Sequence, residues 1–282
     1  MTIQGSVGSI RRILVKAPDP RSLESWRDYG WRAAPDAAIA AREHAAFGDA
    51  LADHGAEVVV AASTAAADPD AIYVYDPVLL TDRGSIMLRP GKRGRRDEVG
   101  AVESDLVREG IPVLGRLAAP ATAEGGDMFW LDEHTLLIGR GYRTNTEGIE
   151  QLGALLGSDI DVVAFDLPHA RGPDSCLHLM SFISPLDRDL AVAYPPMVPV
   201  RLMELLRDRD IDVVEVPDEE FDSMGPNVLA LAPRVALALE GNPRTRLRME
   251  SAGVEVHSYS GDEISRKGDG GPTCLTRALE RD

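Results

Sequence analysis

The chain has 282 residues, of which 44% are hydrophobic and 27% are charged, so it can bury a substantial core without disulfide or metal support. Its formal net charge of −16 argues against nucleic-acid binding, which depends on Lys and Arg neutralising phosphates, and would favour a small cationic partner. Because it has only two cysteines, no visible signal peptide and no long apolar segment, we expect one cytoplasmic domain over residues 1–282, with no membrane contact.

The sequence predicts the same run of elements five times along the chain: a strand, a turn, a helix and a second strand. The strand-and-turn segments are 11–20, 84–94, 135–143, 189–197 and 234–243. The helices that follow them are 39–55, 95–110, 144–157, 198–210 and 243–253, and the second strands are 56–60, 111–114, 161–165, 211–216 and 254–259. In the fourth helix, one stripe can contain Val200, Leu202, Leu205 and Leu206, which is the pattern of an amphipathic helix.

A spacing of roughly 40 to 50 residues between like units favours an array or a propeller over an irregular sheet. Five units closed around an axis would form a five-bladed α/β-propeller, and their turns would meet at one central cavity. The simpler alternative is an ordinary α/β sheet in which the regular spacing arises by chance. We expect the propeller, with the functional residues in the turns.

Three polar features stand out against this framework. Glu124 precedes two glycines, which allow a close backbone approach, and His178 lies in the otherwise apolar run 177–183. Cys274 follows Gly268, Gly270 and Gly271, and exposed backbone N–H groups beside a thiol could favour the thiolate. Each feature alone also fits a surface turn, a core histidine or a structural cysteine.

Taken together, the three features resemble a known family. Glu124, then the histidine of "LHLMS", then the cysteine of "GDGGPTCLT" resemble the order in the guanidine-modifying, or pentein, superfamily. "RPGKRGRRDE", "GRGYRTNTEG" and "NPRTR" look like further landmarks, so the resemblance runs over residues 12–279. It implies a five-bladed α/β-propeller of ββαβ units and an enzyme related to arginine deiminases, amidinotransferases and dimethylarginine dimethylaminohydrolases.

The resemblance also implies the catalytic roles. Cys274 would be the nucleophile and His178 the proton-transfer residue, and Glu124 and Asp76 would hold the guanidinium nitrogens of a small cationic substrate. A thiolate that attacks the guanidinium carbon divides one difficult substitution into two easier steps. The family chemistry requires no metal and no cofactor.

The residues that hold the other end of the substrate follow from the same resemblance. Asp70 would lie near the substrate α-amino group, and Arg95 and Arg143 would hold its carboxylate. Arg96 is an equally good choice in place of Arg95, because a shift of one residue in the alignment exchanges them.

Met180 favours one branch of the family. Deiminases and amidinotransferases carry an acid two positions after the histidine, whereas an apolar Met180 leaves room for alkyl groups, as in the dimethylarginine dimethylaminohydrolase branch. We therefore expect hydrolysis of an N-methylated arginine. A guanidine deiminase, an amidinotransferase and a non-catalytic ribosome-binding pentein remain alternatives, and a homodimer remains possible.

Two further positions bear on the substrate and on metal binding. Tyr75, where the branch usually has Glu, adds bulk near the expected substrate. Cys176 and His178 form a Cys-x-His pair, but we interpret Cys176 as buried structure and not as a metal ligand.

Overall fold

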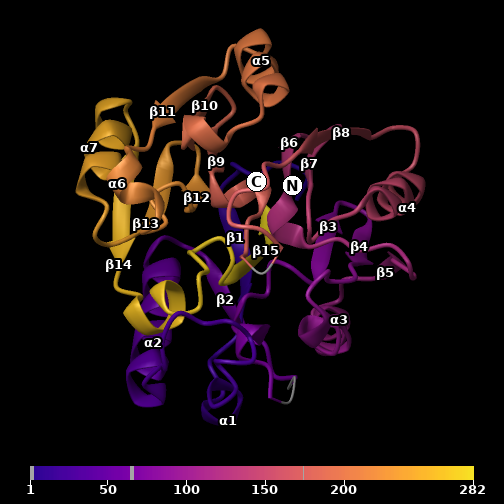
Figure 1. The fold of residues 1–282 in the computed structure, drawn as a ribbon, viewed down its shortest axis with the longest axis vertical. Helices are drawn as coiled ribbons and strands as arrows, with labels where there is room; N and C mark the ends of the chain where they lie inside the picture. The colour runs from indigo at the N-terminus through magenta and orange to yellow at the C-terminus, as the bar shows by residue number, and fades with distance from the viewer. Residues whose placement is uncertain (1–2, 64–66, 174) are drawn as a thin grey trace.

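Five three-stranded sheets surround a common centre in the computed structural model, which describes residues 3–63, 67–173 and 175–282 (Figure 1). The first sheet contains β15 (Thr276–Arg281), β1 (Ile10–Val15) and β2 (Glu57–Val60). The next two contain β3 (Val78–Thr81), β4 (Gly84–Met87) and β5 (Val113–Arg116), and β6 (Met128–Asp132), β7 (Thr135–Arg140) and β8 (Asp161–Asp166). The last two contain β9 (Ile183–Asp187), β10 (Leu190–Ala193) and β11 (Asp212–Glu215), and β12 (Val228–Ala232), β13 (Val235–Leu239) and β14 (Glu255–Tyr259).

Every sheet has the same connectivity. The middle strand pairs antiparallel with one outer strand and parallel with the other. The parallel strand follows the middle strand in the chain, and a helix connects the two. These helices are α2 (Ala37–Asp53), α3 (Glu98–Arg108), α4 (Thr146–Leu156), α5 (Val200–Asp208) and α7 (Pro243–Ser251). They lie at the periphery, outside the sheets (Figure 1). The predicted five-bladed α/β-propeller is therefore confirmed.

The remaining helices are short and lie in the connections. The two short α-helices are α1 (Pro20–Leu23) and α6 (Asp218–Phe221). The 3-10 helices are η1 (Pro69–Ile72), η2 (Arg93–Arg95), η3 (Gly125–Asp127), η4 (Leu179–Ser181) and η5 (Pro195–Met197), and η6 (Asp262–Arg266) is a π-helix.

The two ends of the chain close the ring of sheets. The C-terminal strand β15 pairs antiparallel with β1, so that Val15 lies opposite Thr276. In the other four sheets, the strand that pairs antiparallel with the middle strand comes just before it in the chain. In the first sheet, the C-terminal strand β15 takes this role. As a result, Cys274 lies just ahead of the first strand of its sheet, β15. Its position is equivalent to that of the residues just ahead of β3, β6, β9 and β12 in the other four sheets.

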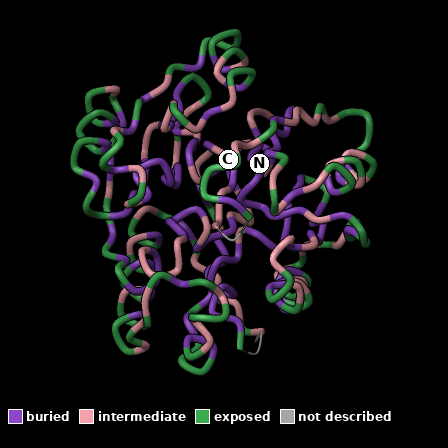
Figure 2. Tube along the Cα trace, viewed as in Figure 1, coloured by how far each residue is buried: buried purple, intermediate pink, exposed green. Residues whose placement is uncertain are grey.

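Local sequence explains why the elements begin where they do. Asp36 caps α2 by accepting hydrogen bonds from the N–H groups of Ala38 and Ile39, and Asn145 caps α4 in the same way through Gly148. The strands nearest the centre are short runs of apolar residues, and buried residues fill the middle of the molecule while exposed ones cover the helices (Figure 2). Within the described ranges, no helix is long and apolar enough to span a membrane.

Candidate active site

One polar residue stands shortly before the first strand of every sheet. Asp76 precedes β3, Glu124 precedes η3 and β6, and His178 precedes η4 and β9. Asn227 comes directly before β12, and Cys274 comes shortly before β15. The fivefold arrangement therefore brings one side chain from each unit toward the centre, and four of the five are residues that the sequence singled out.

A cavity of about 660 Å³, which we call the polar cavity, opens onto Asp76, His178 and Cys274. Asp70, Asp76, Arg95, Arg143, His178 and Cys274 all line it. Arg95, in η2, and Arg143, between β7 and α4, come from the turns that follow the middle strands β4 and β7. The structure thus brings six of the seven predicted site residues to one cavity wall, and the seventh, Glu124, lies directly behind it.

Glu124 is fully buried and holds other parts of the site in place. His178 Nε2 lies 2.7 Å from its carboxylate, Arg143 Nη1 donates to it at 2.9 Å, and the Lys92 N–H donates at 3.0 Å. Burial would raise the pKa of Glu124, but the hydrogen bond with His178 and the charge of Arg143 outweigh burial and hold it well below its usual value. The carboxylate is therefore ionised and already has partners, although the sequence assigned it to the substrate.

His178 is buried with its second nitrogen facing two other groups. Nδ1 lies 3.7 Å from Cys176 Sγ and 4.0 Å from Asp76 Oδ1. Burial lowers the pKa of His178, but the nearby Cys176, Asp76 and Asp127 outweigh burial and raise it well above its usual value. The imidazole is therefore charged at neutral pH and can donate a proton.

Asp76 and Arg95 form a buried ion pair inside the cavity. Asp76 Oδ1 also accepts from the Gly126 N–H at 2.8 Å, and Arg95 also pairs with Glu98 at 2.8 Å. Burial would raise the pKa of Asp76, but Arg95 and His178 lower it below its usual value. A side chain on Gly126 would collide with His178 and Asp76, which explains the glycine at that position.

The Cys274 thiol faces the cavity in a desolvated setting. Asn227 Nδ2 donates to Sγ at 3.5 Å, and a side chain at Gly271 would collide with Asn227. Burial, followed by the charge of Asp76, raises the pKa of Cys274 to about 12, while His178 and a backbone hydrogen bond from Gly271 act in the opposite direction. In the free protein Cys274 is therefore a thiol and not a thiolate.

At the other end of the polar cavity, Asp70 is buried between two donors. Trp31 Nε1 donates to Asp70 Oδ1 at 2.7 Å, and Lys92 Nζ forms an ion pair with Oδ2. Lys92 and Tyr29 also line the cavity, and the Lys92 ammonium lies over the Tyr29 ring. This end of the cavity therefore offers cations and an anion side by side.

Two alternatives that the sequence left open can be compared directly. Arg95 lines the cavity, whereas Arg96 directs its Nε to the Pro90 carbonyl, so the geometry favours Arg95. Tyr75 lines neither the polar cavity nor the pocket described next, because its ring packs against the Arg277 guanidinium. Its bulk therefore does not lie where the sequence suggested.

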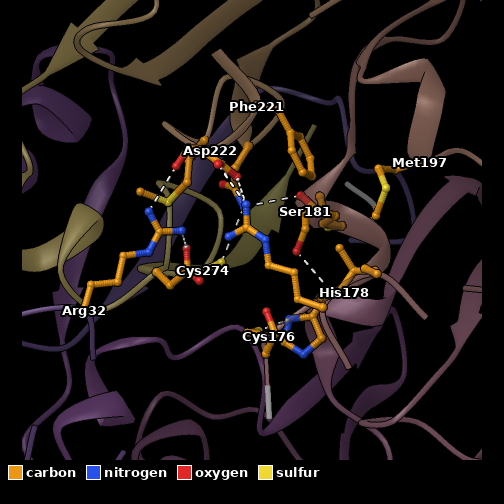
Figure 3. Close-up of a pocket in the computed structure, with 17 residues that line it drawn as sticks. Arg32, Cys176, His178, Ser181, Met197, Phe221, Asp222 and Cys274 are labelled. Carbon is orange, nitrogen blue, oxygen red and sulfur yellow. Dashed lines mark hydrogen bonds and ion pairs between the residues drawn. The ribbon is translucent and has the colours of Figure 1, made fainter. Parts of the chain in front are cut away.

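A second hollow of about 220 Å³, which we call the apolar pocket, adjoins the polar cavity. Cys274, His178 and Cys176 line both hollows, and Met180 also lines the apolar pocket. Figure 3 shows Cys274, His178 and Cys176 around the apolar pocket. Met180 is thus part of the wall beside the predicted nucleophile, and Cys176 faces the site although we interpreted it as buried structure.

Asp76, Glu124 and His178 have potential metal-ligand atoms within 4.8 Å of one another, the one such group among the described residues. Both carboxylates already pair with Arg95 or Arg143, cations that a metal ion would have to displace. The donor set therefore fits a metal poorly.

Asn227 and Lys92 are the site residues that sequence reasoning missed. Asn227 ends the segment "GPN" ahead of an apolar strand, just as Asp76 and Glu124 stand ahead of theirs. Comparing the same position in all five units would have found it. Lys92 lies among four nearby arginines, so nothing in the sequence distinguishes it from a solvated basic turn.

Comparison with known proteins agrees with this geometry. A family model described as N,N dimethylarginine dimethylhydrolase, eukaryotic, matches residues 30–280. The N(G),N(G)-dimethylarginine dimethylaminohydrolase of Pseudomonas aeruginosa is 30% identical over 269 residues, 94% of this chain and 98% of that protein. An arginine deiminase of Mycoplasma capricolum is 33% identical over 196 residues, 57% of this chain and 47% of that enzyme.

Similarity also extends to solved structures. A mutant of the Pseudomonas aeruginosa dimethylarginine dimethylaminohydrolase, complexed with citrulline, has a TM-score of 0.77 at 27% identity. The match covers 95% of this chain and 98% of that one. From the family model, the sequence identity and the shared fold, we conclude that the chain belongs to the dimethylarginine dimethylaminohydrolase family.

Proposed function

We propose that this chain hydrolyses an N-methylated arginine to citrulline and a methylamine, with Cys274 as the nucleophile. Membership of the family supports the reaction class, a hydrolase that acts on the C–N bond of a linear amidine. The observation that carries the proposal is the position of Cys274 and His178, which line both the polar cavity and the apolar pocket that contains Met180.

The polar cavity suits the amino-acid part of the substrate. Arg95 and Arg143 would hold the α-carboxylate, since a guanidinium can bind a carboxylate through two parallel hydrogen bonds. Asp70 would accept from the α-ammonium group, because each carboxylate oxygen can accept more than the one hydrogen bond it has from Trp31 or Lys92.

Asp76 would bind the substrate guanidinium and bring its central carbon to Cys274. The substrate cation then lies beside the thiol, whose pKa of about 12 must fall before it can attack. A positive charge at this position favours the thiolate, so the substrate itself helps to activate the nucleophile. The free enzyme would therefore keep an unreactive thiol until the substrate arrives.

The chemistry then proceeds in two substitutions. With the substrate bound, the Cys274 thiol loses its proton to solvent and the thiolate forms a C–S bond to the guanidinium carbon. His178 gives a proton to the substituted nitrogen, and the C–N bond breaks to release the amine. Neutral His178 next takes a proton from a water molecule, whose oxygen bonds to the same carbon as the C–S bond breaks. The second proton of that water passes to the departing Cys274 sulfur, which restores the thiol, and citrulline leaves with His178 protonated again.

Glu124 would act in this scheme as a positioning residue. It binds His178 Nε2 at 2.7 Å and is fully buried, which leaves Nδ1 as the nitrogen that transfers the proton. A buried carboxylate beside a histidine fixes the orientation of the ring and stabilises its charged form. This role differs from the contact with the substrate guanidinium that the sequence suggested.

Arginine deiminase activity is the second candidate. The observation in its favour is the 33% identity to an arginine deiminase over 57% of this chain. An amidinotransferase differs only in that an amine, and not water, resolves the covalent intermediate. The apolar surroundings of Met180 argue for an alkylated nitrogen, because unsubstituted guanidinium would leave N–H groups without partners there.

The test is to incubate the protein separately with asymmetric dimethylarginine, monomethylarginine, arginine and agmatine, and to measure both amine and ureido product. We expect citrulline from the two methylated arginines and none with the Cys274→Ser variant. Turnover of arginine without turnover of either methylated form would refute the proposed substrate and favour the deiminase.

The cytoplasmic location, the single domain and a homodimer stay predictions.

A further inference from the structure

The apolar pocket and the polar cavity adjoin at the predicted reaction centre. Cys274, His178 and Cys176 belong to both walls. The amino-acid groups of the proposed substrate would occupy the polar cavity, so the substituted terminal nitrogen must point toward the apolar pocket. His178, which has to protonate that nitrogen, lies between the two.

Side chains with no charge form most of the pocket wall beyond Cys274. Five of them are Leu177, Met180, Met197, Phe221 and Met224. Figure 3 shows Phe221 and Met197 across the pocket from His178 and Cys176. The Phe221 ring stacks on Tyr194 with centroids 4.2 Å apart, which fixes one wall, whereas methionine side chains can adjust to the shape of a ligand.

The pocket is larger than the proposed methylamine group requires. Its volume is about 220 Å³. A buried apolar cavity of roughly 150 Å³ already accommodates benzene. Two methyl groups would therefore leave most of the pocket unfilled.

Charges at the pocket wall are already paired. Arg171 binds both carboxylate oxygens of Asp222, at 2.7 and 2.8 Å, and Arg32 binds Asp269 at 2.6 Å. A cationic end group on the substituent would have to compete with these arginines. The pocket therefore suits a neutral hydrocarbon group.

We infer that the enzyme prefers arginines whose terminal guanidine nitrogen carries a neutral hydrocarbon group larger than methyl, of about four to seven carbons, which enters the apolar pocket and leaves as the amine. This inference rests on the proposed function and extends it to a broader substrate class. The Met180 side chain contributes to this selection but is one part of an apolar wall that Leu177, Met197, Phe221 and Met224 also form.

The experiment compares kcat/KM for Nω-methyl-, ethyl-, propyl- and butylarginine by the citrulline formed. Burying one methylene group is worth roughly a fourfold factor, so three additional groups give up to about 60-fold. We expect the value for butylarginine to exceed that for methylarginine by at least tenfold. Equal or falling values along the series would overturn the inference while leaving the proposed function intact.

A charged analogue tests the neutral character of the pocket. The Nω-(3-aminopropyl) derivative has the chain length of butyl but ends in an ammonium group. We expect its kcat/KM to be at least tenfold below that of butylarginine. If it is the better substrate, Asp222 or Asp269 binds the cation and the hydrocarbon assignment is wrong.

Variants then place the effect in the pocket. Met197→Trp should fill it and lower the ratio of butylarginine to methylarginine kcat/KM by tenfold or more, and Met197→Leu should retain the preference because its volume is similar. Leu247→Trp, at an exposed position outside both cavities, is the matched control and should leave the ratio unchanged. An unchanged ratio in Met197→Trp would contradict the assignment.

Binding separates this inference from the proposed reaction. If no N-substituted arginine gives citrulline, the proposed function fails, and calorimetry on the Cys274→Ser variant still measures the pocket. Tighter binding of butylarginine than of methylarginine supports the pocket, and equal or weaker binding refutes it.

Discussion

Replacing Asp76 with Asn should change thiol reactivity and catalysis in opposite directions. Asp76 is buried, and its charge is the second cause, after burial, that raises the pKa of Cys274. The same charge is the one we propose for binding the substrate guanidinium. The Asp76→Asn variant should therefore hold a more reactive Cys274 and yet hydrolyse the substrate more slowly.

The gain in thiol reactivity should be smaller than the loss in catalysis. If the loss of one nearby charge lowers the pKa of Cys274 by about one unit, the thiolate fraction rises roughly tenfold below that pKa. A less basic thiolate is also a weaker nucleophile, with a Brønsted coefficient of about 0.45, so the alkylation rate should rise only about threefold to fourfold. Losing a charge-assisted hydrogen bond to the substrate costs about 2 to 3 kcal/mol, which lowers kcat/KM by roughly 30- to 150-fold.

The assay is alkylation of the free protein by iodoacetamide at pH 8, followed by mass spectrometry of the peptide that contains Cys274. Citrulline formation is measured on the same samples. Asp70→Asn is the matched control, because Asp70 is a buried acid of the same cavity that is not a main cause of the shift at Cys274. It should weaken catalysis without changing alkylation. Slower alkylation in Asp76→Asn, or unchanged kcat/KM, would refute the reasoning.

Three other predictions follow from the charges and walls of the site. Because burial raises the pKa of Cys274 to about 12, the thiolate fraction, and with it kcat/KM, should rise about tenfold per pH unit around neutrality. The raised pKa of His178 keeps its imidazole charged there, so a bell-shaped profile centred near 7 would disagree. Met180→Asp should shift preference from dimethylarginine toward arginine by at least tenfold in relative kcat/KM, and no shift would mean that Met180 only packs. Burial raises the pKa of Asp127 to about 7, above its unfolded value, so this group stabilises the fold below about pH 4 and that stability is lost as pH rises through 7. Urea unfolding of Asp127→Asn should therefore show it about 2 to 4 kcal/mol more stable than wild type at pH 8 and similar at pH 4, and equal stability at pH 8 would count against a raised pKa.

The parts of the fold that repeat locally could be predicted, whereas the parts that depend on distant pairing could not. The middle strands, the crossover helices and the parallel strands follow one another closely, so their pattern is visible in each unit. The first strand of each sheet was not identified from the residues, because a run such as Val78–Thr81 is short and wholly buried and shows no alternation. The pairing of β15 with β1 joins the two ends of the chain, and no local pattern reports it.

The site shows a similar division. Residue types and their order singled out Cys274 and His178, and the structure brings both to the polar cavity. The hydrogen-bond partners of Glu124 could not be predicted, because His178 and Arg143 come from other parts of the chain and meet it only in the folded protein. Asn227 was missed because an asparagine that contacts a cysteine has no characteristic sequence spacing from it. Its position becomes informative only when the five units are compared.

The pairing of Arg95 with Asp76 bears on why the substrate should be an amino acid. In the free protein this cation and this anion compensate each other inside the polar cavity, so neither charge is buried alone. A substrate that carries both a guanidinium and a carboxylate can give Asp76 a new cation and Arg95 a new anion in one binding event. A guanidine without a carboxylate offers only the first partner and leaves Arg95 with Glu98 at 2.8 Å and Asp70 at 3.9 Å as its nearby anions. The exchange of partners, and not the attraction of a single charge, is therefore the physical basis on which this site would select a whole guanidino amino acid.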